Sequence, residues 1–202
     1  MHLFFSIVQV ESFWGGELWV DSQTGKLYSK IDGDSLIEVR NFKTGIVENT
    51  ITHKRGDWAL SPCGHYMATV APLDSVIHIG EIKDSTLRNK YSYVVDKGRI
   101  NSFSYSPDGR FLVLGTSGKG NRVYIWDWQN KVIKDSWVAH VYGVKKAHFS
   151  TDGAHVVTCG DKQRTITLFK DNTVLDDDTI KIWNTRTGDL AYIIHSGKQF
   201  KH

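Results

Sequence analysis

The residues of this chain that most suggest chemistry are a glycine-rich loop and a group of histidines. The loop Gly115-Thr116-Ser117-Gly118-Lys119-Gly120 has the composition of a phosphate-binding loop. It lacks the GxxxxGK(S/T) spacing, and it precedes an expected strand, so no helix N-terminus would face a phosphate. We therefore predict a hairpin turn at this position.

The histidines lie closest together in the second half of the chain, at His140, His148 and His155. No Cys or carboxylate completes a recognisable ligand set around them, so we predict no metal site. The sequence contains neither a GxSxG elbow nor an HExxH motif, and nothing pairs its Ser, His and Asp residues as a triad. We expect no catalytic residues, no cofactor and no enzymatic activity.

Three short Ser-x-x-Gly segments recur along the chain at an almost fixed interval. They are Ser61-Pro62-Cys63-Gly64, Ser106-Pro107-Asp108-Gly109 and Ser150-Thr151-Asp152-Gly153. The first two serines are 45 residues apart and the last two are 44 apart, a period typical of repeat arrays. Each segment suits a tight turn, because Pro fits the second position and Gly accepts a positive φ.

Short alternating or apolar runs surround each turn, and they predict β-strands. One strand precedes each turn, with Trp58 and Leu60, Phe103 and Tyr105, or Ala147 and Phe149 on one face. Further strands are expected at 66–70, 76–82, 111–116, 122–128, 154–159, 179–184 and 190–195, and an earlier partial copy at 17–20, 27–31 and 36–42. The second strand of each unit is expected to be covered on both faces. Repeated units of four short antiparallel strands predict an all-β radial or sandwich architecture.

The third strands carry a more specific signal. Val123-Tyr124-Ile125-Trp126-Asp127 and Ile180-Lys181-Ile182-Trp183-Asn184 resemble the Trp-Asp ending of WD40 repeats, and Ala139-His140 stands in the place of their Gly-His pair. The resemblance covers residues 45–195, and 17–44 less closely. It implies a WD40-repeat β-propeller of four-stranded antiparallel blades, either a whole member of the family or a truncated or partial one. About four blades are recognisable, at 17–44, 45–90, 91–131 and 132–195, after an N-terminal segment 1–16.

The same resemblance implies a hydrogen-bonded set of His, Ser or Thr, Asp and Trp in each repeat. Hydrogen bonding within such a set is physically reasonable, since these polar groups are costly to bury unpaired. In the last unit the matching residues are His140, Thr158, Asp177 (or Asp161) and Trp183. The second unit has His53, Thr69 and Asp74 but Gly80 in place of Trp, and the third has Trp126 but no His. We expect the units to differ in stability.

Basic residues recur just before the first strand of each unit. They are Lys54, Arg55, Lys97, Arg99, Lys145 and Lys146. In a propeller these positions would gather around one mouth of the central channel, and we call the set the basic arc. Such an arc could attract an acidic or phosphorylated peptide, or RNA; alternatively, its charges only solubilise the rim.

Two features depart from the WD40 pattern. Propellers have four to eight blades, and an open array leaves strand edges unpaired. Three interpretations follow: the chain is a fragment, it closes with another copy or another chain, or it forms a small closed ring. The second departure is the stretch 162–176, whose removal would leave an ordinary WD40 join. It is interpreted either as an insertion of gene-model or splicing origin or as a long exposed hairpin.

Composition places further limits on function. The net charge of +3 over 202 residues is too small to argue for nucleic-acid binding by itself. The apolar run at 3–10 is too short to span a bilayer and lacks the features of a signal peptide. Cys63 and Cys159 form no CxxC pattern, which favours a reducing compartment. We expect a cytoplasmic or nuclear protein, or one found in both, with no membrane partner.

The resemblance implies a non-catalytic scaffold or adaptor that binds other proteins through its propeller loops. The alternative is a component of a larger complex that binds RNA or an acidic or phosphorylated peptide through the basic arc.

Two minor predictions concern single residues. Trp14, Trp19, Trp128 and Trp137 are expected to pack within blades, and Lys181 is expected to be a solvated charge on an exposed strand.

Overall fold

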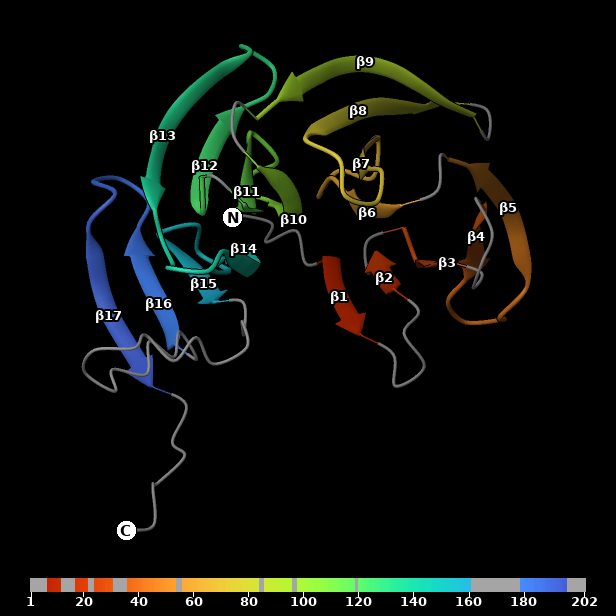
Figure 1. The fold of residues 1–202 in the computed structure, drawn as a ribbon. Coiled ribbons are helices and arrows are strands. Elements are labelled where there is room, and N and C mark those ends of the chain that lie inside the picture. The colour runs from red at the N-terminus through yellow and green to blue at the C-terminus, as the bar shows by residue number, and fades with distance from the viewer. Residues whose placement is uncertain are drawn as a thin grey trace, which may run out of the picture. The chain divides into compact units, whose positions relative to one another are not determined.

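The computed structural model describes residues 7–11, 17–21, 24–30, 36–53, 56–83, 86–95, 98–118, 120–160 and 179–195. These residues form strands and turns, without any helix (Figure 1). By their contacts the residues group into two compact units, the first made of 1–94 with 107–109 and the second of 95–106 with 110–202. The all-β prediction is therefore confirmed.

The first unit contains two antiparallel successions of strands. One consists of β1 (Ile7–Glu11), β2 (Glu17–Asp21), β3 (Lys26–Lys30), β4 (Leu36–Asn41) and β5 (Val47–Thr52). The other consists of β6 (Asp57–Leu60), β7 (Tyr66–Val70), β8 (Val76–Lys83) and β9 (Thr86–Val94). A single parallel residue pair, Thr52 with Thr86, joins them into one nine-stranded sheet.

The second unit contains two separate four-stranded antiparallel sheets. The first is β10 (Arg99–Tyr105), β11 (Phe111–Ser117), β12 (Arg122–Asp127) and β13 (Val132–Val138). The second is β14 (Val144–Phe149), β15 (His155–Gly160), β16 (Thr179–Asn184) and β17 (Leu190–His195). Each strand pairs with the next one along the chain, so both sheets are simple meanders of the kind found in propeller blades.

The three Ser-x-x-Gly segments form the same turn, as their sequences predict. The Ser61 hydroxyl accepts a hydrogen bond from the Tyr66 N–H at 3.0 Å. The equivalent bonds from Phe111 to Ser106 and from His155 to Ser150 are both 2.9 Å. The glycines at the fourth positions have φ values of 71°, 71° and 69°, which L-residues with a Cβ rarely adopt. One local mechanism thus sets the register of three hairpins.

Apolar side chains of the two sheets of the second unit meet in one buried cluster. Val113, Val123 and Ile125 come from β11 and β12, and they pack with Val144, Ala147, Val156 and Trp183 of the following sheet, with Ala139 beside them. Trp137 packs against this cluster, and its ring centroid lies 5.5 Å from that of Trp183. Stacked sheets typically bury their facing side chains in this way.

Most strand predictions are confirmed to within one or two residues at each end. The described strand groups span 7–52, 57–94, 99–138 and 144–195. The last three expected repeat units begin before the first strand of the corresponding group, and the 90/91 boundary divides β9. Within the expected N-terminal segment, β1 pairs antiparallel with β2 as an edge strand. The stretch 162–176 lies outside the described residues.

One burial prediction holds for only two of the three second strands. In β7 and β11 every residue after the first is buried, whereas in β15 buried residues alternate with half-buried ones. The physical reason is that, within the described part of the chain, only one face of β15 packs against another sheet.

The packing prediction for tryptophans holds at Trp19 and Trp128, which are 6% and 2% exposed, and Trp14 lies outside the described residues.

A glycine with positive φ stands before the first strand of three of these groups, a feature that sequence reasoning missed. Gly56, Gly98 and Gly143 have φ values of 145°, 96° and 120°. A Cβ on Gly56 would lie 2.0 Å from the Val70 carbonyl oxygen, and one on Gly98 would lie 2.2 Å from that of Ser117. The glycines at 56 and 98 therefore let the chain pass close to the end of the second strand of the same group, whereas a Cβ on Gly143 would meet Ser117 of the preceding sheet.

Candidate interaction surface

The first strands of the two sheets in the second unit, β10 and β14, lie side by side. The Ala147 N–H donates to the Ser102 hydroxyl at 3.0 Å, and the Asn101 amide donates to the Val144 carbonyl at 3.1 Å. Ser102 is 7% exposed. Its buried hydroxyl therefore bonds to the neighbouring strand and not to solvent. These bonds bring the starts of β10 and β14 to the same end of the unit.

Three of the four residues of the last predicted set come together. Thr158 Oγ1 lies 2.8 Å from His140 Nε2 and accepts a hydrogen bond from Trp183 Nε1 at 2.9 Å. All three residues are buried, with Thr158 fully so. Asp177 and the alternative Asp161 lie outside the described residues. The threonine hydroxyl thus connects the chain before β14 to β15 and β16.

Lys181 extends this connection, and its prediction as a solvated charge is wrong. Its Nζ donates to the Ala139 carbonyl at 2.6 Å, and the residue is half-buried. Thr158 and Lys181 are cross-strand partners, so Lys181 shares the sheet face that carries the buried set. Long aliphatic stems are often buried in this way while the ammonium group reaches a polar partner.

The two partial sets do not form the same arrangement. His53 and Thr69 are buried, and the Asp74 carboxylate accepts the N–H groups of Ser75 and Val76 at 2.7 and 3.1 Å. Gly80 occupies the cross-strand position of Trp183, opposite Met67, and Leu87 fills the space where a Cβ would lie.

In the next sheet, Trp126 is 1% exposed, but the threonine position is taken by an apolar residue. Leu112 pairs with Trp126 just as Val156 pairs with Trp183. Two residues further along β11 stands Leu114, where β15 has Thr158. The hydroxyl that joins the last set therefore has no counterpart at this position.

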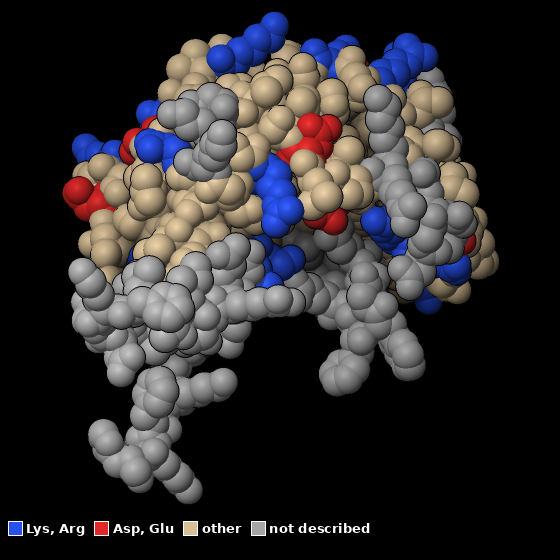
Figure 2. Space-filling view, in the orientation of Figure 1, with Lys and Arg blue, Asp and Glu red and all other residues tan. Residues whose placement is uncertain are grey.

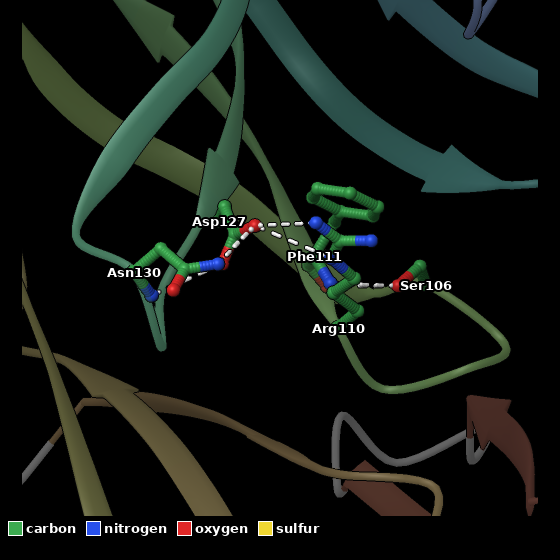
Figure 3. A network of polar contacts seen from close by, with 5 residues as sticks. All are labelled: Ser106, Arg110, Phe111, Asp127 and Asn130. Carbon is green, nitrogen blue, oxygen red and sulfur yellow. Dashed lines mark hydrogen bonds and ion pairs between the residues drawn. The ribbon is translucent and has the colours of Figure 1, made fainter.

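A second polar network surrounds Asp127, the Asp of the Trp-Asp pair (Figure 3). Its carboxylate accepts hydrogen bonds from the Asn130 backbone and side chain at 3.1 and 3.0 Å and from Arg110 Nη2 at 3.2 Å. Asp127 is 6% exposed, whereas the Arg110 side chain is 58% exposed. The network fixes the turn after β12 and ties it to the start of β11. The sequence pattern singles out Asp127 through the recurring Trp-Asp ending, but it does not identify Asn130 and Arg110 as the hydrogen-bond partners of Asp127.

Burial by itself raises the pKa of the Asp127 carboxyl, but the hydrogen bonds from Asn130 and Arg110 outweigh burial and lower the pKa below its ordinary value. Because the pKa is lower in the folded chain than in the unfolded chain, the ionised carboxylate stabilises the folded state at pH values above its ordinary pKa. This contribution is lost as the pH falls through the lowered value.

We therefore expect Asp127→Asn to reduce the free energy of unfolding by about 1–2 kcal/mol near neutral pH. The difference from the unsubstituted protein should shrink in acid. Urea midpoints at neutral and acidic pH measure both effects, with the exposed Asp189→Asn as control. An equal difference at both pH values would show that Asp127 acts through shape alone.

The basic arc is only partly within the described residues. Lys54, Arg55 and Lys97 lie outside them, while Arg99, Lys145 and Lys146 are exposed. Arg99 Nε donates to the Ser117 hydroxyl at 3.1 Å. Arg99 begins β10 and the two lysines lie near the start of β14, so the structure brings these three positions to one end of the second unit. Figure 2 shows the basic side chains of one face as separate groups, with acidic and uncharged residues between them.

The described part of the chain contains no group of three or more His, Cys, Asp or Glu residues placed to hold a metal. It likewise contains no helix long and apolar enough to cross a membrane. Cys63 and Cys159 are both free thiols.

Comparison with known families identifies one segment of the chain. The family described as WD domain, G-beta repeat, matches residues 89–127. The matched segment runs from within β9 to the end of β12 and is similar in sequence to a WD40 repeat. This match and the four-stranded antiparallel sheets fit a member of the WD40 β-propeller family. The observed fold is consistent with a partial β-propeller. WD40 domains generally bind other proteins, and they are typically non-catalytic scaffolds.

Proposed function

We propose that this protein is a non-catalytic scaffold that binds other proteins through the loops joining its strands. The observation that carries the proposal is the WD40 repeat at 89–127 within a succession of four-stranded antiparallel sheets. Rigid sheets hold their connecting loops in fixed positions, which is how binding residues are commonly presented.

The use of the buried polar side chains supports a structural role for them. Thr158 connects His140 to Trp183, Asp127 fixes a turn, and Ser102 joins two strands. A catalytic group must instead reach a substrate with its reactive atom. These buried side chains are committed to the fold, which leaves the exposed loops as the surface for partners.

Affinity capture tests the proposal. The tagged full chain is incubated with an extract of its source cells after nuclease treatment, and bound proteins are quantified against a tag-only control. A scaffold should retain at least one protein in near-stoichiometric amount. If every retained protein disappears after nuclease treatment, the direct partner is a nucleic acid and the proposal is wrong.

A second candidate function rests on the proximity of Arg99 to Lys145 and Lys146. Hydrogen bonds from the Asn101 and Ser102 side chains of β10 to the backbone of β14 support this proximity at one end of the second unit. Positive charges on a rigid rim attract anionic segments and speed their association. We propose an acidic or phosphorylated peptide as the ligand at this end.

Charge reversal provides the test of this candidate. The triple variant Arg99→Glu, Lys145→Glu, Lys146→Glu should bind a fluorescent glutamate-rich peptide at least about tenfold more weakly than the unsubstituted chain. Arg186→Glu, at an exposed turn, is the control and should bind normally. Equal binding by all three proteins would reject the candidate. Preferential binding of oligouridylate, with a steep salt dependence, would indicate RNA instead.

A further inference from the structure

The turn between β4 and β5, residues 41–46, is held by its backbone and by the side chain of its first residue. The Gly45 N–H donates to the Asn41 carbonyl at 2.8 Å, and the Asn41 N–H donates to the Ile46 carbonyl at 2.9 Å. The Asn41 side-chain oxygen accepts a hydrogen bond from the Lys43 N–H at 3.0 Å, and Gly45 has a φ of 70°. These bonds use only backbone groups and the Asn41 side chain.

The turn between β16 and β17, residues 184–189, repeats this pattern. The Gly188 N–H donates to the Asn184 carbonyl, and the Asn184 N–H donates to the Asp189 carbonyl, both at 2.9 Å. The Asn184 side-chain oxygen accepts a hydrogen bond from the Arg186 N–H at 2.8 Å, and Gly188 has a φ of 74°. The two turns therefore share one local conformation, and their residues can be compared position by position.

The two turns differ at their second and sixth positions. The β16–β17 turn has the polar residues Thr185 and Asp189 there. The β4–β5 turn has Phe42 and Ile46, which are 60% and 66% exposed, and the next residue, Val47, is 39% exposed. We call Phe42, Ile46 and Val47 the apolar tip. Because the polar residues form the same turn, the fold does not require Phe and Ile at these positions.

The turn after β12 shows how an aromatic residue at the second position can serve the fold. Trp128 follows Asp127 at the end of β12, just as Phe42 follows Asn41 at the end of β4. Trp128 is 2% exposed, and its ring meets that of Tyr105 edge-on, with the ring centroids 6.3 Å apart. Phe42 is instead mostly exposed, so its ring contributes little to the stability of the folded chain.

The charges along the chain beside the apolar tip are balanced, which favours a protein over a membrane as the partner. Arg40 forms an ion pair with Glu38, and the Asn41 side-chain amide donates to Glu48 at 2.9 Å. With Lys43, this stretch carries two positive and two negative side chains. Segments that lie on membranes combine apolar residues with an excess of Lys and Arg.

We propose, on the basis of the scaffold function above, that the apolar tip anchors a protein partner whose apolar pocket takes up the Phe42 and Ile46 side chains. Burial of these side chains removes apolar surface from water. Aromatic residues buried in a partner's pocket often supply much of the binding energy of an interface. The hydrogen bonds of the turn fix its backbone before binding, so little ordering is left to oppose association.

A transfer of residues between the two matching turns tests the proposal. The double variant Phe42→Thr, Ile46→Asp should keep the urea midpoint of the unsubstituted chain, because Thr and Asp form the same turn at 184–189. Isothermal titration measures binding to the nuclease-resistant protein obtained by affinity capture and then purified. The double variant should bind this protein at least about tenfold more weakly.

Val132→Asp is the matched control. Val132 follows the positive-φ Lys131 in the turn after β12, as Ile46 follows Gly45, and it is 56% exposed. This variant should bind the purified partner normally. Equal weakening by Val132→Asp would show that added charge alone causes the effect, and the apolar tip would not be the anchor.

The other outcomes separate this proposal from the scaffold function on which it rests. Equal binding by the double variant and the unsubstituted chain overturns the apolar tip as anchor and leaves the scaffold function standing. A clear fall in the urea midpoint of the double variant assigns Phe42 and Ile46 to the fold and also overturns it. If the unsubstituted chain captures no protein, both proposals are wrong. If only the unsubstituted chain binds vesicles of phosphatidylcholine and phosphatidylserine, the tip contacts a membrane instead.

Discussion

Trp183→Ala is expected to lower the free energy of unfolding by about 3–5 kcal/mol. The indole is 8% exposed and belongs to the buried cluster between the two sheets of the second unit. Its removal leaves a cavity beside Trp137, whose ring centroid lies 5.5 Å away. It also removes the N–H donor to Thr158, so the hydroxyl that connects β15 to His140 loses a partner.

Trp183→Phe separates these contributions, because it keeps most of the apolar volume and removes only the donor. We expect this variant to lose about 1–2 kcal/mol. Urea unfolding followed by far-ultraviolet circular dichroism measures both variants without relying on tryptophan fluorescence. Equal losses for Phe and Ala would mean that the hydrogen bond, and not packing, dominates. A loss below about 1 kcal/mol for Ala would contradict the assigned burial.

Gly98→Ala is expected to destabilise the second unit by roughly 3 kcal/mol. The residue has a φ of 96°, and its new Cβ would lie 2.2 Å from the Ser117 carbonyl oxygen. Because that oxygen belongs to the backbone of β11, the clash cannot be relieved by a change of rotamer. The start of β10 must therefore move away from the end of β11.

Gly45→Ala is the matched control for this prediction. Gly45 also has a positive φ, 70°, but a Cβ there would have no neighbour within 4 Å. Only the backbone preference is lost, at a cost of about 1 kcal/mol. Urea midpoints of the two variants give the comparison. Equal destabilisation by both substitutions would show that the close approach to Ser117 contributes nothing.

The local features of the fold could be predicted because single short segments determine them. Ser61-Pro62-Cys63-Gly64 and its two counterparts each form the same turn, with the same hydroxyl-to-backbone bond. Two of the third strands, at 122–127 and 179–184, are marked by Trp-Asp or Trp-Asn endings, and the second strands are marked by their apolar runs. These signals act within about ten residues of chain, so they do not depend on how the sheets pack.

The remaining features depend on partners that the sequence does not reveal. Lys181 is half-buried because its cross-strand partner is the buried Thr158; its charge alone predicted exposure. Gly98 is needed because the Ser117 carbonyl approaches it from another strand. Of the predicted His, Thr, Asp and Trp set, three members meet. The choice between Asp177 and Asp161 stays a prediction, because both lie outside the described residues.

Hydrogen exchange on a captured complex tests the scaffold proposal most directly. The chain is purified with its nuclease-resistant partner, and amide exchange is compared with that of the chain alone. The proposal predicts new protection confined to the loops between strands, with unchanged slow exchange in β11, β12 and β15. If the partner instead binds a form in which these strands exchange rapidly, it recognises the unfolded chain, and the protein is not acting as a folded scaffold.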